Sequence, residues 1–266
     1  MGISRNEFDF LAIAHSKGLL PQGGSILEIG EARSYVKLLD LVQDTRLSIN
    51  SAQSDAIFSA AQAYRDSVLG HDRHHELVGF FVAKQIYKAL FTYNDIVSLD
   101  YSGSDDAVKV DLNEPFSLGR RFDVCINCGT TEHIFNQYQV FKTIHDHTAP
   151  GGAMIHWQPI HGFHHINHGM FLPQPGMFYD LAHANGYAVA FAALSNDERM
   201  VELENPWVDG GFVRETFGDR DNYFYVVLRK TVDAPFKAPQ QYESRKTKDE
   251  LARSWEQLQV PVRGSR

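Results

Sequence analysis

Residues 25–34 read SILEIGEARS, an apolar run that stops at a glycine and continues into a short polar turn. A short run rich in isoleucine and leucine and bounded by glycines is typical of a buried strand. Gly30 would allow the backbone to approach a ligand closely, because it has no side chain. The stretch therefore predicts a strand that ends at a ligand-binding turn.

Six further apolar runs follow, and helical stretches separate most of them. Strands that alternate with helices predict an α/β fold whose sheet is mostly parallel. We expect a Rossmann-like, mostly parallel seven-stranded sheet with flanking helices, in which the last two runs could form an antiparallel pair. The runs are residues 25–30, 95–100, 106–111, 122–127, 152–158, 187–194 and 223–230.

About 64 residues separate the first two runs, whereas a crossover between parallel strands requires only about 10 to 12. A helical insertion after the first strand is therefore expected, over about residues 46–93, where apolar residues recur at helical spacing. These helices could pack on the core or form a lid over a site. We expect one domain over residues 1–233 and a polar C-terminal tail over residues 234–266.

The composition is that of an ordinary globular protein, with 43% hydrophobic and 22% charged residues among 266. A formal net charge of −8 argues against a nucleic-acid partner. There is no apolar run near the roughly 20 residues that span a bilayer, and MGISRNEFDF lacks the order of a secretory signal. We expect a cytoplasmic protein with no membrane partner; a homo-oligomer is compatible with the sequence.

Cys125 and Cys128 form a C-x-x-C pair, a spacing that can bind zinc or carry redox chemistry. They lie within FDVCINCG, which reads as a buried strand. An offset of three residues on a strand sends two side chains to opposite faces. Structural packing is therefore the favoured interpretation.

Polar or glycine residues follow the predicted strands where ligands collect in open parallel sheets. The series LEIG, SLD, VDLNEP, FDVCINCGTTEHI and APGGAMIHWQP occurs in this order. It resembles the class I S-adenosylmethionine-dependent methyltransferases over about residues 24–195, omitting the insertion. The resemblance is specific to the superfamily and not to a substrate.

The resemblance implies that S-adenosylmethionine is the cofactor. Glu28 and the turn from Gly30 to Ser34 would hold its methionine portion, Asp100 its ribose, and the segment 128–132 would line the sulfonium. The usual G-x-G-x-G is changed here to Gly-Glu-Ala-Arg-Ser. The implied cofactor-binding residues are Glu28, Gly30, Glu31, Ala32, Ser34, Asp100, Tyr101, Asp111, Leu112, Cys128, Gly129, Thr130 and Glu132.

Eight of the thirteen histidines fall within residues 133–168. His133 follows the fourth strand, near the expected methyl acceptor. His145 and His147 come at the far end of the next helix, about 18 to 21 Å away at 1.5 Å per residue, so we expect them to be structural or solvated. His156 lies on the fifth strand, as a core histidine or a site residue.

Residues 159–169, PIHGFHHINHG, follow the fifth strand and should form a wall of the substrate site. Three interpretations stay open: a structural loop, a substrate site with one histidine as general base, and a metal site. The candidate bases are His133, His161 and His165, since imidazole titrates near neutral pH. A divalent metal ion would use two or three of the loop histidines His161, His164, His165 and His168, alone or with a carboxylate; no metal ligand set is assigned.

The expected function is transfer of a methyl group from S-adenosylmethionine to an oxygen or nitrogen of a small-molecule acceptor. Holding donor and acceptor in line can supply much of the acceleration, and a histidine would remove the acceptor's proton. One alternative is a non-catalytic binding or scaffold protein with the methyltransferase fold. Another is a metal-dependent enzyme centred on the His161–His168 loop.

Overall fold

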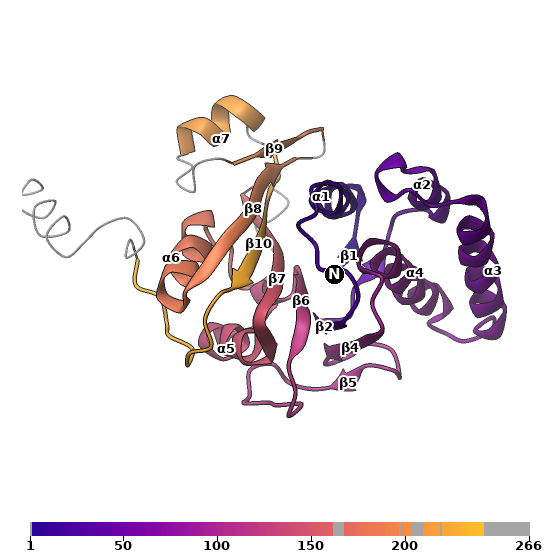
Figure 1. The fold of residues 1–266 in the computed structure, drawn as a ribbon, viewed down its shortest axis with the longest axis horizontal. Coiled ribbons are helices and arrows are strands. Elements are labelled where there is room, and N and C mark those ends of the chain that lie inside the picture. Colours follow the sequence, from indigo (N-terminus) through magenta and orange to yellow (C-terminus); the bar gives the residue numbers. More distant parts are fainter. Residues whose placement is uncertain (1, 162–167, 197, 204–209, 219, 242–266) are drawn as a thin grey trace, which may run out of the picture.

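The protein is organised around one eight-stranded sheet in the order β5-β4-β2-β6-β7-β10-β8-β9 (Figure 1). The computed structural model describes residues 2–161, 168–196, 198–203, 210–218 and 220–241. The strands of the sheet are β2 (Ser25–Ile29), β4 (Asp95–Asp100), β5 (Val108–Lys109), β6 (Phe122–Cys128), β7 (Thr148–His161), β8 (Tyr187–Ser195), β9 (Met200–Glu202) and β10 (Asn222–Lys230).

All seven predicted runs contain strands of this sheet, and the last two, in β8 and β10, form an antiparallel pair as expected. The sheet has eight strands rather than seven, however, and it is mixed rather than mostly parallel. β5, β4, β2, β6 and β7 are parallel. β10 is antiparallel to both of its neighbours, and the additional strand β9 is antiparallel to β8. The three residues of β9 are too few to show an alternating pattern, so its sequence gave no signal.

Helices cover both faces of the sheet and enclose two cores. α1 (Arg5–Ser16) and α4 (His74–Phe91) pack on one face, and α5 (Gln137–His147) and α6 (Pro175–Asn185) on the other. α6 ends at Gly186, which has φ +62, the left-handed conformation in which glycine commonly ends a helix. α7 (Gly210–Phe217) lies near β9 at one end of the molecule (Figure 1).

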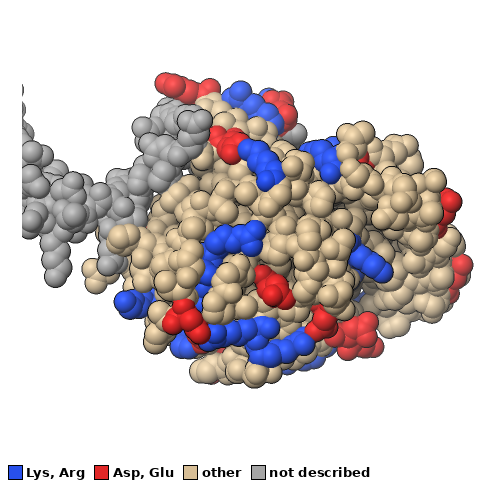
Figure 2. All heavy atoms as spheres, viewed as in Figure 1, with Lys and Arg blue, Asp and Glu red and all other residues tan. Residues whose placement is uncertain are grey.

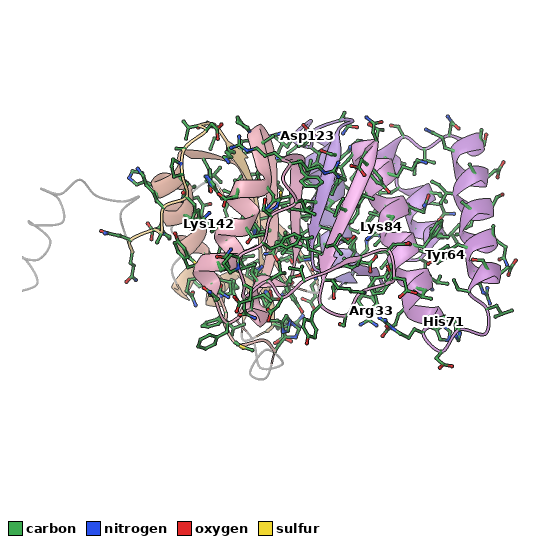
Figure 3. The ribbon with its side chains drawn as sticks, turned by 90° about the horizontal axis from the view of Figure 1, so that it is seen from below. Arg33, Tyr64, His71, Lys84, Asp123 and Lys142 are labelled. Carbon is green, nitrogen blue, oxygen red and sulfur yellow. The ribbon has the colours of Figure 1, made fainter. Side chains whose placement is uncertain are left out.

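The long connection between β2 and β4 contains α2 (Leu38–Gln43), the 3-10 helix η1 (Thr45–Leu47), α3 (Ser51–Ser67) and α4. α4 packs on the sheet, so it is the crossover helix that any parallel pair requires, and α3 lies outside it. The rings of Tyr64 on α3 and Phe81 on α4 stack with centroids 4.4 Å apart. Figure 3 shows Tyr64 on this outer helix and Lys84 between α4 and the sheet.

The two cysteines lie on opposite faces of β6, as predicted. Cys125 belongs to the core under α5 and α6, and Cys128 to the core under α1 and α4. Burial raises the pKa of the Cys125 thiol to about 12 and that of Cys128 well above its usual value. Neither thiol is poised as a thiolate, which agrees with a packing role.

The described helices and the charges on one face bear on which partners the chain could have. In the part of the chain that the structure describes, no helix combines the length and apolarity that a membrane span requires. On the face in Figure 2, acidic and basic side chains are interspersed. The predicted tail begins packed on the body: the backbone of Lys237 makes two hydrogen bonds with Asn185. Residues 242–266 of the tail lie outside the described residues.

Candidate functional site

The carboxyl ends of β2 and β6 mark the point where the strand order changes direction. β4 and β5 extend to one side of β2, and β6 and β7 to the other. Ligands of open α/β sheets bind at such switch points, outside the carboxyl ends of the strands. Two surface hollows lie at this edge.

The first hollow has a volume of about 380 Å³, within the range of about 300 to 1,000 Å³ that is typical of small-molecule sites. It combines residues that follow four different strands. Those that bear on its chemistry are Gly30, Asp100, Asp111, Leu112, Thr130 and His133. The structure thus brings together, in one place, the ends of β2, β4, β5 and β6.

Asp100 lines the first hollow, and backbone N–H groups hold both oxygens of its carboxylate. One of its oxygens accepts a hydrogen bond from the backbone N–H of Glu31 at 2.7 Å, and the other from that of Ser102 at 2.7 Å. A carboxylate oxygen can accept more than one hydrogen bond. Asp100 can therefore accept two hydroxyls of a ligand without losing its own supports.

Apolar and aromatic groups flank that carboxylate. Leu112 is buried against the core, whereas Tyr101 is 80% exposed. Asp111 is exposed, and hydrogen bonds from the backbone and side chain of Asn113 lower the pKa of its carboxyl. The hollow offers an apolar wall beside a charged one, which suits an amphipathic ring system.

The segment after β6 is held by side-chain hydrogen bonds from Asn127. Its Oδ1 accepts from the backbone N–H groups of Thr130 and Thr131, each at 3.2 Å. The hydroxyl of Thr130 donates to the carbonyl of Ile29, which ties this turn to the end of β2. Gly129 has φ +58, a conformation that a side chain disfavours.

Four of the predicted cofactor residues turn away from both hollows. Glu28 is fully buried and accepts hydrogen bonds from Lys84, Tyr87, Ser98 and the backbone N–H of Ala32. The other three are likewise engaged within the protein: Glu31 with Ser104, Ala32 in the core, and Ser34 with the backbone of Val36.

Lys84 is a structural partner of this turn that the sequence did not reveal. Burial lowers the pKa of Lys84, but the Glu28 and Glu31 carboxylates outweigh burial, so the pKa is raised overall. The available signal was a lysine that directly follows the apolar stretch LVGFFVA of this helix. In this chain, the acidic residues Glu28 and Glu31 therefore link the LEIG turn to α4 through Lys84.

The second hollow has a volume of about 360 Å³ and lies on the other side of the segment after β6. Cys128, Gly129 and Glu132 of the predicted set line it. Glu7, Trp157 and His168 also contribute. Residues 129–134 therefore form a wall between the two hollows, with Glu132 on one side and His133 on the other.

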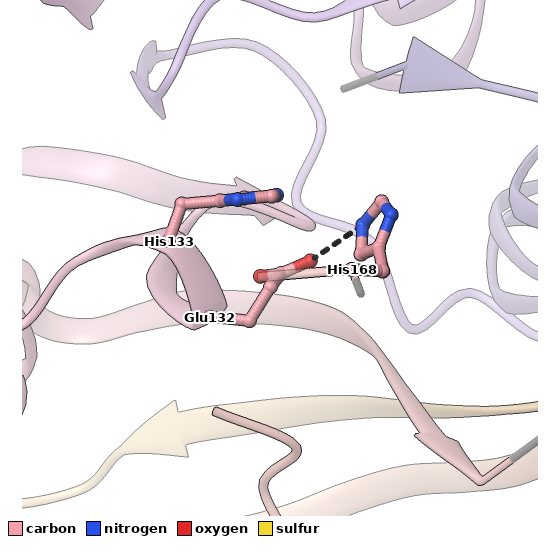
Figure 4. Close-up of side chains that lie close together, drawn as sticks. All are labelled: Glu132, His133 and His168. Atoms are coloured by element: carbon pink, nitrogen blue, oxygen red, sulfur yellow. Dashed lines mark ion pairs between the residues drawn. The ribbon is translucent and has the colours of Figure 1, made fainter. Parts of the chain in front are cut away.

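Glu132 is a buried carboxylate in that wall, with 1% of its surface exposed. Neither of its oxygens has a hydrogen-bond partner among the described residues. The ring Nε2 of His168 lies 3.8 Å from Oε1 (Figure 4), and the rings of His133 and His168 have centroids 5.0 Å apart. One ligand atom from each of the three residues lies within 4.8 Å of the others.

The two histidines beside Glu132 have opposite titration behaviour. Partial burial lowers the pKa of His133, and the Glu132 charge opposes this only in part. Interaction with the Glu132 carboxylate raises the pKa of His168. As the pH falls, the His133 ring therefore stays neutral to a lower pH than the His168 ring does, and a neutral ring can accept a proton.

The other described histidines of the cluster are structural. His145 and His147 are buried rather than solvated, with ring hydrogen bonds to the carbonyls of Ala234 and Thr143, each at 2.7 Å. His156 is a core histidine: burial lowers its pKa to about 3, and its Nδ1 lies 3.2 Å from the amide nitrogen of Asn127.

Of the three candidate bases, only His133 is placed at the site. The backbone of His161 closes β7 opposite Asn222, but its side chain lies outside the described part of the structure. His164 and His165 also lie outside the described residues. His168 was named in the sequence only as a loop histidine, because nothing local relates it to Glu132, 36 positions earlier.

No family model and no curated protein matches this chain. Among solved structures it is similar to the N-methyltransferase NodS from Bradyrhizobium japonicum in complex with S-adenosylhomocysteine. That similarity has 12% identity over 86% of this chain and 87% of that one, with a TM-score of 0.43. A putative methyltransferase from Bacillus halodurans is 8% identical over 84% of this chain and 100% of that one, with a TM-score of 0.48.

The 1,6-didemethyltoxoflavin-N1-methyltransferase from Burkholderia thailandensis, with its substrate and S-adenosylhomocysteine bound, is 11% identical. It covers 84% of this chain and 76% of that one, with a TM-score of 0.34. With TM-scores below 0.5, these similarities do not assign an activity to the chain.

Proposed function

We propose that this chain transfers a methyl group from S-adenosylmethionine to an oxygen or nitrogen of a small molecule. The observation that carries the proposal is the first hollow. Gly30, Asp100, Leu112 and Thr130 come from four strand ends and meet at the switch point of the sheet. The resemblance to class I methyltransferases assigns these four strand ends to the cofactor.

The residues of the first hollow fit the nucleoside portion of that cofactor. The Asp100 carboxylate has lone pairs left for ribose hydroxyls, and Leu112 supplies an apolar contact for a base. Glu28, Glu31, Ala32 and Ser34 do not reach it. The methionine portion would therefore rely on the backbone around Gly30, which lines the first hollow and has no side chain to prevent close approach.

The acceptor would bind in the second hollow, beyond the wall formed by residues 129–134. The cofactor supplies an electrophilic methyl group, and the protein's part is to hold donor and acceptor in line and to exclude water. His133 lies in the wall on the side of the first hollow, and its lowered pKa keeps the ring neutral near pH 7. A metal-free His133 ring could therefore take the acceptor's proton where the two hollows adjoin. His161 and His165 stay candidates for the same role.

Calorimetry with S-adenosylhomocysteine tests the proposal. We expect Asp100→Asn to weaken binding by about tenfold or more, because a charged hydrogen bond contributes about 1.5 to 3 kcal/mol. Asp105→Asn is the matched control, since it removes the same charge from an exposed position of the same loop. The proposal fails if the unmodified chain does not bind, or if the two variants bind equally.

A further inference from the structure

Glu132 has an unusual environment for a carboxylate. It is 1% exposed, yet neither oxygen accepts a hydrogen bond from a described residue. Burial of a carboxylate without hydrogen bonds is costly, and the ion pair with His168, at 3.8 Å, is too long to supply one. A bound cation would compensate for the lost hydration, and it is one of the recognised explanations for a buried polar group without a hydrogen bond.

Glu132 lies so close to the backbone of Gly129 and Gly169 that neither position has room for a side chain. A Cβ at Gly129 would lie 3.0 Å from Oε1 of Glu132, and a Cβ at Gly169 would lie 2.9 Å from its Cγ and from its carbonyl oxygen. Both glycines have positive φ, at +58 and +74. In addition, the backbone N–H of Met170 donates to the Glu132 carbonyl at 2.7 Å. The chain thus packs closely around this carboxylate from both sides.

The ring nitrogens nearest to Glu132 complete a set of metal-ligand types. We propose that Glu132, His133 and His168 bind a divalent first-row transition-metal ion in the wall between the two hollows. Their ligand atoms come from two segments, the turn after β6 and the chain that returns after β7, and all lie within 4.8 Å of one another. In Figure 4 the two rings face the carboxylate from different sides.

The chemistry of the donors selects the class of metal. Two imidazoles and one carboxylate are the protein ligands of catalytic zinc sites and of non-haem iron sites, whereas magnesium and calcium prefer oxygen ligands. Ligand atoms about 2.1 Å from an ion, at angles of about 90° to 110°, are about 3.0 to 3.4 Å apart. The pair His168 Nε2 and Glu132 Oε1, at 3.8 Å, needs only a small side-chain rotation to reach that separation.

Three protein ligands leave at least one coordination position for another molecule. Glu132 and His168 line the second hollow and His133 the first, so the ion would lie where the two spaces adjoin. If methyl transfer takes place as proposed, the ion would bind the acceptor's oxygen or nitrogen. Metal binding itself does not depend on that function.

Titration of the chelator-treated full chain with Co²⁺, followed by calorimetry and visible absorption, tests the site. We expect one Co²⁺ per chain, and an affinity reduced by about tenfold or more in Glu132→Gln and in His168→Ala. His183→Ala is the control, because His183 is exposed on α6, away from the cluster, and it should bind as the unmodified chain does.

Absence of Co²⁺ binding, or equal affinity in all variants, would overturn the site. Far-ultraviolet circular dichroism shows whether each variant folds. If Glu132→Gln does not fold, His168→Ala and His133→Ala decide the question, because both side chains are partly exposed. S-adenosylhomocysteine binding, measured on the same samples, separates this outcome from the proposed function: a chain that binds it and not Co²⁺ lacks the metal site alone.

Discussion

Replacement of Lys84 by methionine should destabilise the fold through Glu28. In the structure, the ammonium group of Lys84 contacts the Glu28 carboxylate, which is fully buried. Methionine keeps the apolar stem but leaves that charge without its cation. Removal of one partner from a buried ion pair costs about 3 to 5 kcal/mol. Tyr87 and Ser98 still donate to the carboxylate, so we expect a loss near about 3 kcal/mol.

Urea unfolding measures this loss. With an m value of about 3 kcal/mol/M, a loss of about 3 kcal/mol lowers the midpoint by about 1 M. Lys88→Met is the matched control, because Lys88 is exposed on the same helix one turn later, and it should change the midpoint little. The double variant Lys84→Met, Glu28→Gln should recover part of the stability, since its buried side chain carries no charge. Equal midpoints for the two lysine variants would refute the reasoning.

Two further predictions concern the core and the Glu132 wall. The pKa of His156 is about 3 in the folded chain and near 6.5 in the unfolded chain. Between these pH values only the unfolded state binds the proton. The free energy of unfolding should therefore be highest above pH 6.5 and fall by up to about 1.4 kcal/mol per pH unit as the pH falls towards 3. His156→Gln should flatten that slope in urea midpoints between pH 7 and 5, and an unchanged slope would contradict the assignment. Gly169→Ala should lower the melting temperature more than Gly151→Ala does: both have positive φ, at +74 and +80, but only the first places its Cβ against Glu132. Equal losses would show that backbone strain alone is responsible.

The fold was largely predictable because apolar runs and helical periodicity report burial directly. SILEIG and FDVCIN became the paired central strands β2 and β6, and the offset between Cys125 and Cys128 correctly placed them on opposite faces. The antiparallel pairing of the last two runs was anticipated, but the placement of β10 between β7 and β8 was not, because periodicity carries no information about which strands pair. Within the predicted insertion, α4 packs on the sheet as the crossover helix and α3 lies outside it.

The site was predictable in position and less so in its contacts. Asp100 and Leu112 line the first hollow, because the carboxyl ends of parallel strands lie at the same edge of the sheet. Glu28 does not, because its role depends on Lys84, a partner 56 positions later that no local pattern relates to it. The grouping of Glu132 with His168 has the same origin, since a loop return brings them together. The sequence suggested loop histidines as metal ligands, together with a carboxylate that it could not identify; the structure places Glu132 beside His168.

If methyl transfer takes place as proposed, the wall of residues 129–134 has a consequence for the order in which cofactor and acceptor bind. Because the two hollows lie on opposite sides of it, a molecule in one would not obstruct entry to the other, and the two substrates would bind in either sequence. Initial-rate kinetics should then show intersecting lines, with each product competing against its own precursor. A compound that joins a nucleoside to an acceptor mimic across this wall would occupy both spaces at once, and the tether would raise its affinity above that of either half.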